Sequence, residues 1–147
     1  MKKFVFRLET LLQHRQSLEE RERTKFSRVR GELLAEQANL QQLQTKHQET
    51  RSDLASKKTG DCDGGEIDLC YRFLNRLDRE IVQSTRRLVQ LQMQVEKQKQ
   101  SMIEASRDRK MIENLREKRE KEFQVALEQG ERKAVDEIVV TRFGFRQ

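Results

Sequence analysis

Residues 60–65, Gly-Asp-Cys-Asp-Gly-Gly, form one short break between two long tracks of apolar residues that recur every seven positions. A heptad repeat sustained over several turns buries one narrow stripe of a helix against another helix. The chain contains no proline, and the glycines of the break allow it to reverse direction. The sequence therefore predicts an all-α fold in which two long helices form an antiparallel coiled-coil hairpin.

The composition is typical of long solvated helices and not of a thick globular core. Charged residues make up 38% of the chain and aromatic residues 5%. Disorder would not keep Leu, Ile, Val and Met in register every seven residues, so the periodicity favours helix. We expect a single domain over residues 1–147, made of a helix at 4–58, a loop at 59–65, a longer second helix at 66–140 and a short tail at 141–147.

In the first helix the expected contact stripe, here called the first seam, follows steps of three and four residues. It consists of Phe4, Leu8, Leu11, Arg15, Leu18, Glu22, Phe26, Val29, Leu33, Glu36, Leu40, Leu43, His47, Thr50 and Leu54. Its 4-4-3 steps between Leu18 and Val29 predict a stutter, where a supercoil loosens. Its polar members are Arg15, Glu22, Glu36, His47 and Thr50. Polar seam residues usually fix the register of two helices while lowering their stability.

The second helix carries a cleaner paired track, here called the second seam. One row contains Ile67, Leu74, Ile81, Leu88, Val95 and Met102, and the other contains Cys70, Leu77, Ser84, Leu91, Gln98, Ala105 and Ile112. The pattern continues less regularly through Leu115, Phe123, Ala126, Leu127, Ala134 and Ile138. Neither Gly nor Pro occurs between Glu66 and Gln129, so Gly130 is the first candidate for a kink.

The two predicted helices differ in length. At about 1.5 Å per residue, residues 4–58 span roughly 80 Å and residues 66–140 roughly 110 Å. Phe4 should then lie near residue 120, and the end of the second helix should project beyond the first. The projecting apolar residues are Phe123, Val125, Leu127, Val135, Ile138, Val139, Val140, Phe143 and Phe145. An apolar stripe without an intramolecular partner is normally a docking surface.

The charge pattern argues against nucleic-acid binding, and the hydropathy argues against a membrane span. The net charge of +6 comes from 31 basic and 25 acidic residues, which alternate in Glu19–Arg23 and Arg116–Glu122. Interspersed signs produce a weak field, so nucleic-acid binding is not expected. No stretch contains the roughly 20 apolar residues that a membrane span needs. Since the chain also shows no signal-peptide pattern, we expect a cytoplasmic protein without a membrane span.

The sequence also lacks the residues of a metal site or an enzyme. Cys62 and Cys70 are too few for a disulfide framework or a four-ligand zinc site, and are expected to be free thiols. His14 and His47 lie on distant turns of one helix and cannot share a site. The acidic loop around Asp61 lacks the full ligand set of an EF-hand. Because phosphate-binding and catalytic motifs are missing too, we expect no metal, no cofactor and no catalysis.

Three stretches carry more distinctive patterns. The chain opens with Phe4–Arg15, FVFRLETLLQHR, and closes with Glu131–Phe143, ERKAVDEIVVTRF. Tyr71–Leu77, YRFLNRL, follows the loop. The first two resemble the F-x-F-x-L-x-x-L-L-x-x-R opening and the E-x-K-x-[LMV]-D-E-x-x-x-x-R ending of the bacterial flagellar FliJ family, and the third also fits that family. Length and loop position agree, so the resemblance covers the chain from end to end.

The resemblance implies a component of the flagellar type III export apparatus with a shape similar to the γ subunit of rotary ATP synthases. The termini of family members enter the hexameric ring of the export ATPase and promote its assembly and activity. Their bodies contact the cytoplasmic domain of the export gate protein and the export chaperones. The expected location is the cytoplasm, at the inner face of the cell membrane at the flagellar base.

The resemblance and the projecting helix end together suggest contact residues. For the ATPase ring we expect Lys2, Lys3, Phe4, Phe6, Arg7, Leu127, Arg132, Lys133, Val135, Ile138 and Arg142. Carried over by position, the export-gate contact would include Asn39, Leu43, Lys46, Thr50, Phe73, Leu77, Glu80 and Ser84. Lys46 and Thr50 replace aromatic residues of some family members. Leu43, Leu77 and Ser84 also lie on the seams, so an alternative interpretation places them in the core.

Two other functions fit the same pattern. A structural or scaffolding homodimer would use the heptads between two chains. The second alternative is the equivalent stalk protein of a virulence type III secretion system, which is the nearest functional relative.

Overall fold

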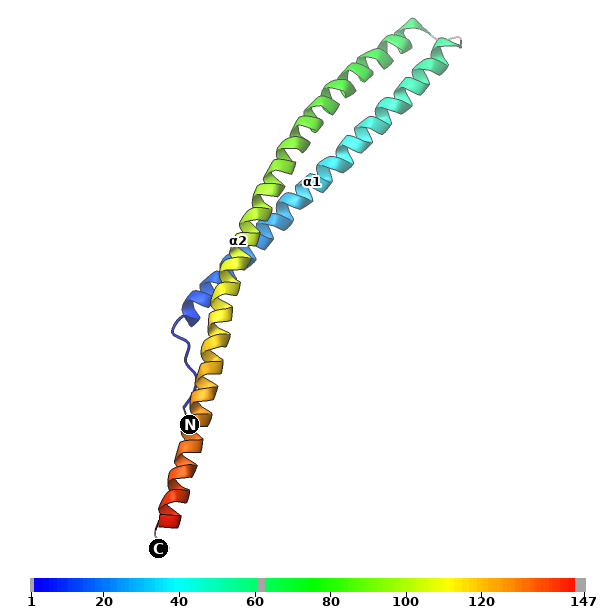
Figure 1. Cartoon of the computed structure of the whole chain (residues 1–147). Helices are drawn as coiled ribbons and strands as arrows, with labels where there is room; N and C mark the ends of the chain where they lie inside the picture. The colour runs from blue at the N-terminus through cyan, green and yellow to red at the C-terminus, as the bar shows by residue number, and fades with distance from the viewer. Residues whose placement is uncertain (1, 61–62, 145–147) are drawn as a thin grey trace. The chain divides into compact units, whose positions relative to one another are not determined.

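The computed structural model describes residues 2–60 and 63–144, which fold into two helices (Figure 1). α1 spans Glu9–Lys58 and contains 50 residues, and α2 spans Gly64–Gly144 and contains 81. The helices run antiparallel and contact each other as a coiled-coil hairpin, and the described residues contain no strand. The predicted all-α hairpin with a longer second helix is confirmed.

The chain divides into two compact units. The terminal unit consists of Met1–Glu20 and Ile103–Gln147, and the loop unit consists of Arg21–Met102. Each unit contains one segment of α1 and one of α2, so each has its own antiparallel helix pair.

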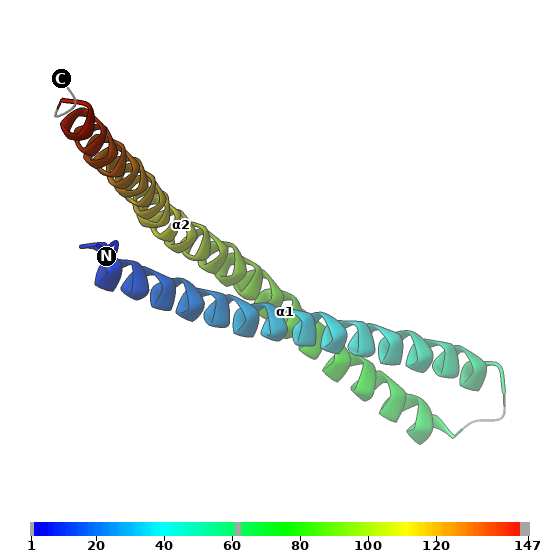
Figure 2. The ribbon, with the colours of Figure 1, turned by 90° about the horizontal axis from the view of Figure 1, so that it is seen from below.

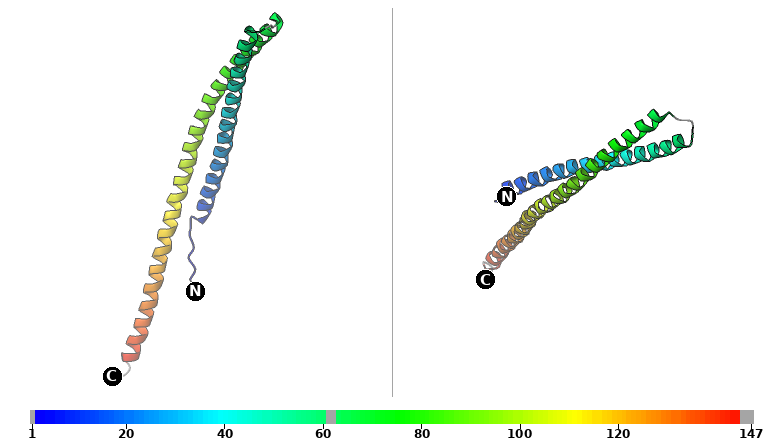
Figure 3. Two further views of the ribbon diagram at one scale, coloured as in Figure 1. Left: turned by 90° about the vertical axis from the view of Figure 1, so that its right-hand side faces the viewer. Right: turned by 90° about the horizontal axis from the view of Figure 1, so that it is seen from above.

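α1 begins at Glu9 instead of residue 4. The residues before it follow an extended path (Figure 3). Residues two apart in an extended chain point to the same side, whereas a helix would turn them to opposite sides. Phe4 and Phe6 are accordingly both half-buried, while Val5 between them is 80% exposed. The Phe4 and Phe123 rings lie 5.7 Å apart, centroid to centroid. This contact confirms that Phe4 lies near residue 120.

α2 begins at Gly64, two residues before the predicted start, because Asp63 caps it. The Asp63 carboxylate accepts a hydrogen bond of 3.4 Å from the backbone N–H of Gly65. The Asp63 carbonyl accepts another, of 3.1 Å, from the backbone N–H of Glu66. The first N–H groups of a helix have no partner within it, so a capping carboxylate stabilises the start.

α2 ends at Gly144 instead of residue 140 and continues through Gly130 without a break. A glycine inside a helix is less favourable than alanine by about 1 kcal/mol. A Cβ built on Gly130 would meet no atom within 4 Å, so no close packing requires a glycine there. The helix formers on either side are sufficient to keep this segment helical.

The core of the loop unit is a row of leucines between α1 and α2. Its buried apolar residues are Leu43, Leu54, Leu74, Leu77 and Leu91. Every residue of the first seam from Glu22 to Leu54, and of the second seam from Ile67 to Met102, is buried or half-buried. The heptad prediction is therefore confirmed in this unit, where α1 crosses α2 in the view of Figure 2.

Polar seam residues of the loop unit have partners on the opposite helix. These pairs are Glu22 with Gln98, Glu36 with Ser84, and His47 with Asp78. Residue numbers rise along α1 as they fall along α2, as expected of an antiparallel pair. That these three residues fix the register stays a prediction, whereas the Thr50 hydroxyl donates to the Lys46 carbonyl of its own helix at 2.7 Å.

The terminal unit has a mixed core. Leu12 is 3% exposed and Glu19 is 5% exposed, while Leu8 and Leu11 are 38% and 37% exposed. The prediction that Leu8 and Leu11 belong to the seam is therefore wrong. α1 starts only after Leu8, and the Arg109 guanidinium holds the Glu19 carboxylate at the interface through an ion pair.

The stutter between Leu18 and Val29 stays a prediction, since Leu18, Glu22, Phe26 and Val29 are all half-buried. A second row runs through the buried Leu12 and Glu19 and consists of positions 12, 15, 19, 22, 26 and 29. The steps of this row alternate three and four. Leu18 is half-buried beside this row.

Ion pairs join α1 to α2 along the terminal unit. They are Glu9 with Arg116 at 3.2 Å, Arg15 with Asp108 at 3.3 Å, and Glu19 with Arg109. Arg15 thus has a partner on the opposite helix, as the polar seam residues of the loop unit do.

Candidate functional site

A groove opens in the terminal unit between the extended N-terminal segment and α2. Its volume is about 800 Å³, and it is lined by Lys3, Phe4, Val5, Phe6, Arg7, Leu8, Leu115, Arg119, Glu122 and Phe123. The groove exists because residues 3–8 are not helical. Packing of Phe4 on Phe123 holds this segment against α2.

The chemistry of the terminal groove is apolar inside and basic at the edge. Phe4, Phe6 and Phe123 are half-buried, whereas Lys3 and Arg7 are exposed. Arg119 on α2 lies 3.6 Å from Glu122, and its side chain is 62% exposed. A surface of this kind can bury apolar groups of a partner while charges at its rim orient an acidic loop.

The structure gathers part of the predicted ring-contact set at this groove. Lys3, Phe4, Phe6 and Arg7 line it, and Lys2 lies exposed next to them. The predicted ring-contact set did not include the other lining residues, which are Val5, Leu8, Leu115, Arg119, Glu122 and Phe123. Arg119 and Glu122 belong to a run of alternating charges, which is typical of a solvated helix face. Their local sequence therefore did not predict a contact role.

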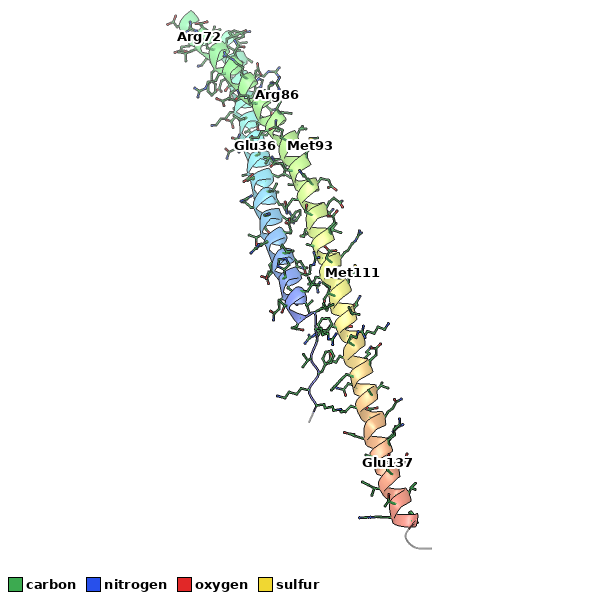
Figure 4. All side chains as sticks on the ribbon, turned by 90° about the vertical axis from the view of Figure 1, so that its left-hand side faces the viewer. Glu36, Arg72, Arg86, Met93, Met111 and Glu137 are labelled. Carbon is green, nitrogen blue, oxygen red and sulfur yellow. The ribbon has the colours of Figure 1, made fainter. Side chains whose placement is uncertain are left out.

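The remaining predicted ring-contact residues lie on the last turns of α2. Leu127 is half-buried, and every residue from 131 to 144 is exposed, including Arg132, Lys133 and Arg142. Val135 and Ile138 are 58% and 56% exposed. Figure 4 labels Glu137 in this segment.

An apolar stripe runs along this part of α2. Val135, Ile138, Val139 and Phe143 follow the spacing that places residues on one helix face. Arg132 and Val135 also line a shallow cavity of about 330 Å³ together with Glu128, Glu131 and Asp136. This stripe has the exposure expected of a projecting helix end.

A second candidate surface lies on the loop unit. Four predicted gate-contact residues, Asn39, Leu43, Glu80 and Ser84, meet around a cavity of about 270 Å³. Glu36, Gln83 and Arg87 complete its lining. The structure therefore brings together residues from both helices that the family resemblance assigns to one contact.

The predicted gate-contact residues differ in accessibility. Leu43, Leu77 and Ser84 are 8%, 2% and 4% exposed, so these three side chains take part in helix packing. Phe73 is 39% exposed, and Asn39 and Lys46 are exposed too, while Thr50 and Glu80 are half-buried. A partner would meet the exposed and half-buried members directly.

Glu36 contacts three polar side chains that line the loop-unit cavity. Its Oε1 accepts hydrogen bonds from Ser84 Oγ at 2.6 Å and Asn39 Nδ2 at 3.4 Å, and Arg87 Nε lies 3.6 Å from Oε2. The Ser84 hydrogen bond lowers the pKa of Glu36 most, burial opposes it, and Asn39 and Arg87 lower the pKa further. The sequence indicated a polar seam position here but not its partners.

The described residues next to the loop show no built site for a metal ion. Cys70 is a half-buried free thiol, and Lys57 Nζ lies 3.8 Å from its sulfur. Cys62 lies outside the described residues, as does Phe145. Within 2–60 and 63–144, no group of three His, Cys, Asp or Glu side chains is placed to hold a metal. No helix in these ranges carries an apolar stretch able to cross a membrane.

The fold is a coiled-coil hairpin with one candidate surface on each unit. The family model described as "Flagellar FliJ protein" matches residues 3–147. The chain belongs to the FliJ family, which associates it with the flagellar export apparatus as a structural component. No curated protein and no solved structure matches the chain.

Proposed function

We propose that this protein is a stalk of the flagellar export apparatus that binds the hexameric export ATPase and promotes its assembly and activity. The terminal unit supplies the ATPase contact. The loop unit supplies the contact with the cytoplasmic domain of the export gate protein, and the stalk also engages export chaperones. It acts in the cytoplasm, at the inner face of the cell membrane at the flagellar base.

The observation that carries the proposal is the packing of Phe4 on Phe123. It joins the basic opening of the chain to α2, so Lys3 and Arg7 share one groove with apolar side chains of both segments. A ring of like subunits must contact a stalk through its slender end. Basic side chains would orient the stalk against acidic loops, and each apolar side chain that becomes fully covered would contribute roughly 1.5 to 3 kcal/mol.

Deletion of residues 131–147 tests the ATPase contact. The described part of the deleted stretch is exposed throughout, so its loss should leave the folding of the helix pairs unchanged. We expect the truncated chain to lose stimulation of ATP hydrolysis by the flagellar ATPase of the same cell while keeping its helicity. If the truncated and full chains stimulate equally, the ATPase contact lies elsewhere on the hairpin.

A matched pair of point variants separates charge from folding. Lys133→Glu and Arg142→Glu reverse exposed charges in the proposed contact, whereas Arg28→Glu and Arg30→Glu reverse the same number of exposed charges in the loop unit. We expect only the first pair to reduce stimulation, most strongly at low salt, because salt screens exposed charges. An equal loss in both pairs would contradict the proposal.

A homodimer is the alternative that the exposed stripe of Val135, Ile138, Val139 and Phe143 favours. Two chains could cover this stripe mutually. A mass measurement by light scattering over a range of concentrations separates a monomeric stalk from a dimer.

A further inference from the structure

A third surface lies on the outward side of α2 in the loop unit, apart from both contacts proposed above. Val82, Val89 and Met93 are 50%, 51% and 70% exposed. At 3.6 residues per turn, these three side chains fall within about 40° of one another around the helix axis. They form an apolar stripe that faces away from the second seam, with Thr85 and Arg86 on the turn between Val82 and Val89.

A row of basic residues borders this stripe on the side farther from the seam. Arg79, Arg86 and Lys97 fall within about 20° of one another around the helix axis. All three side chains are exposed, and none of them forms an ion pair or hydrogen bond with a residue in the ranges 2–60 and 63–144, although the Lys97 backbone carbonyl accepts one from Ser101. Figure 4 labels Arg86 and Met93 on this part of α2.

The opposite border of the stripe differs. Asp78 already pairs with His47 across the hairpin, at 2.8 Å, and Glu96 accepts a hydrogen bond of 3.4 Å from Gln100. The positive charges beside the stripe therefore lie on one border, and the other border carries the carboxylates of Asp78 and Glu96.

We propose that this face, Val82, Val89 and Met93 bordered by Arg79, Arg86 and Lys97, docks an amphipathic helix of a partner protein with one acidic edge. Apolar residues seven and four apart match the contact spacing of a packed helix, so such a partner would lie along α2 as a third helix. Its acidic edge would meet the basic row, which fixes the orientation of the bound helix.

A second copy of the same face that packs antiparallel fits less well. In a two-fold symmetric antiparallel pair, each border of the stripe meets its own counterpart. Arg79, Arg86 and Lys97 would then face the same basic row, and like charges repel. A membrane surface fits poorly too, because interfacial helices insert Trp, Phe or Leu, whereas this stripe offers two valines and one methionine.

The test uses the full chain and two labelled synthetic peptides in fluorescence anisotropy titrations. Both peptides are amphipathic helices of four heptads with the same apolar positions. One carries Glu along the edge that would meet the basic row, and the other carries Lys there. We expect the Glu-edged peptide to bind at least about tenfold more tightly than the Lys-edged peptide, because only its charges are complementary.

Two sets of variants locate the contact. Val89→Asp with Met93→Asp should weaken binding of the Glu-edged peptide at least about tenfold, since both anchors lose their apolar surface. Arg79→Glu, Arg86→Glu and Lys97→Glu together should reverse the preference between the peptides. The matched control, Arg28→Glu with Arg30→Glu and Arg51→Glu, makes the same change in net charge on exposed positions of α1 and should preserve the original preference.

Several outcomes would overturn the proposal. Equal binding of both peptides, or unchanged binding by the Val89 and Met93 variant, would show that this face is not the docking site. Binding to anionic phospholipid vesicles that is stronger than peptide binding and is lost in the charge-reversed variant would assign the face to a membrane surface. Concentration-dependent dimerisation lost in the Val89 and Met93 variant would assign it to a second copy. All variants should still stimulate the export ATPase, so this test is independent of the terminal contact.

Discussion

The Ser84 hydroxyl on α2 donates a hydrogen bond of 2.6 Å to the Glu36 carboxylate on α1, and both side chains are buried. Each residue sits on a seam where a coiled coil would otherwise place an apolar side chain. Ser84→Ala leaves the carboxylate without its shortest hydrogen bond. We expect a loss of about 1–2 kcal/mol in the free energy of unfolding, measured by urea titration at neutral pH.

The same pair predicts a pH dependence of stability. Hydrogen bonding to Ser84 lowers the pKa of Glu36 below its ordinary value of 4.5. The folded protein therefore holds the proton less tightly than the unfolded chain, so this stabilisation is complete above the unfolded pKa and is lost as pH falls through the lower folded pKa. Glu36→Gln should remove this part of the acid sensitivity. An unchanged dependence on pH in that variant would contradict the assignment.

Phe4 and Phe123 should couple energetically. Their contact holds the extended segment against α2, and aromatic pairs contribute about 0.5–1.5 kcal/mol beyond simple burial. We expect Phe4→Ala to increase protease cleavage within residues 2–8 and to reduce ATPase stimulation, with little change in helicity. A double-mutant cycle with Phe123→Ala measures the coupling, and additive effects of the two substitutions would contradict direct packing.

Two glycines offer a stabilisation test. A Cβ on Gly31 or Gly130 would meet no atom within 4 Å, and both residues lie inside helices. Gly31→Ala should raise the stability of the loop unit by about 1 kcal/mol, because alanine favours helix. Gly130→Ala should mainly slow amide hydrogen exchange around residue 130. A decrease in stability for Gly31→Ala would indicate a contact at that position.

The heptad pattern predicted most of the fold, because the chain has one break and a repeat that only paired helices satisfy. It failed at the N-terminus, where the pattern selects Leu8 and Leu11 by hydrophobicity. The structure buries Glu19 there, because Arg109 across the hairpin neutralises it. A long-range ion pair leaves no local signal in the sequence.

The candidate surfaces were predictable to different degrees. The exposed stripe around Val135 and Ile138 followed from the unequal helix lengths alone. The terminal groove did not, because it depends on an extended path that places Phe4 and Phe6 on one side. The gate-contact set came from family resemblance, which does not separate the core residue Leu77 from the exposed Phe73.

Phe73 and Leu77, one turn apart on α2, provide the sharpest test of the loop-unit surface. Phe73 is 39% exposed, so Phe73→Ala should change the free energy of unfolding by less than about 1 kcal/mol. Leu77 is 2% exposed, so Leu77→Ala should lose about 2–5 kcal/mol as it leaves a cavity between the helices. If the gate protein contacts the loop unit, Phe73→Ala should weaken its binding in calorimetry while the melting temperature stays nearly constant. A large drop in melting temperature for Phe73→Ala would place Phe73 in the core, and unchanged binding would place the gate contact on another surface.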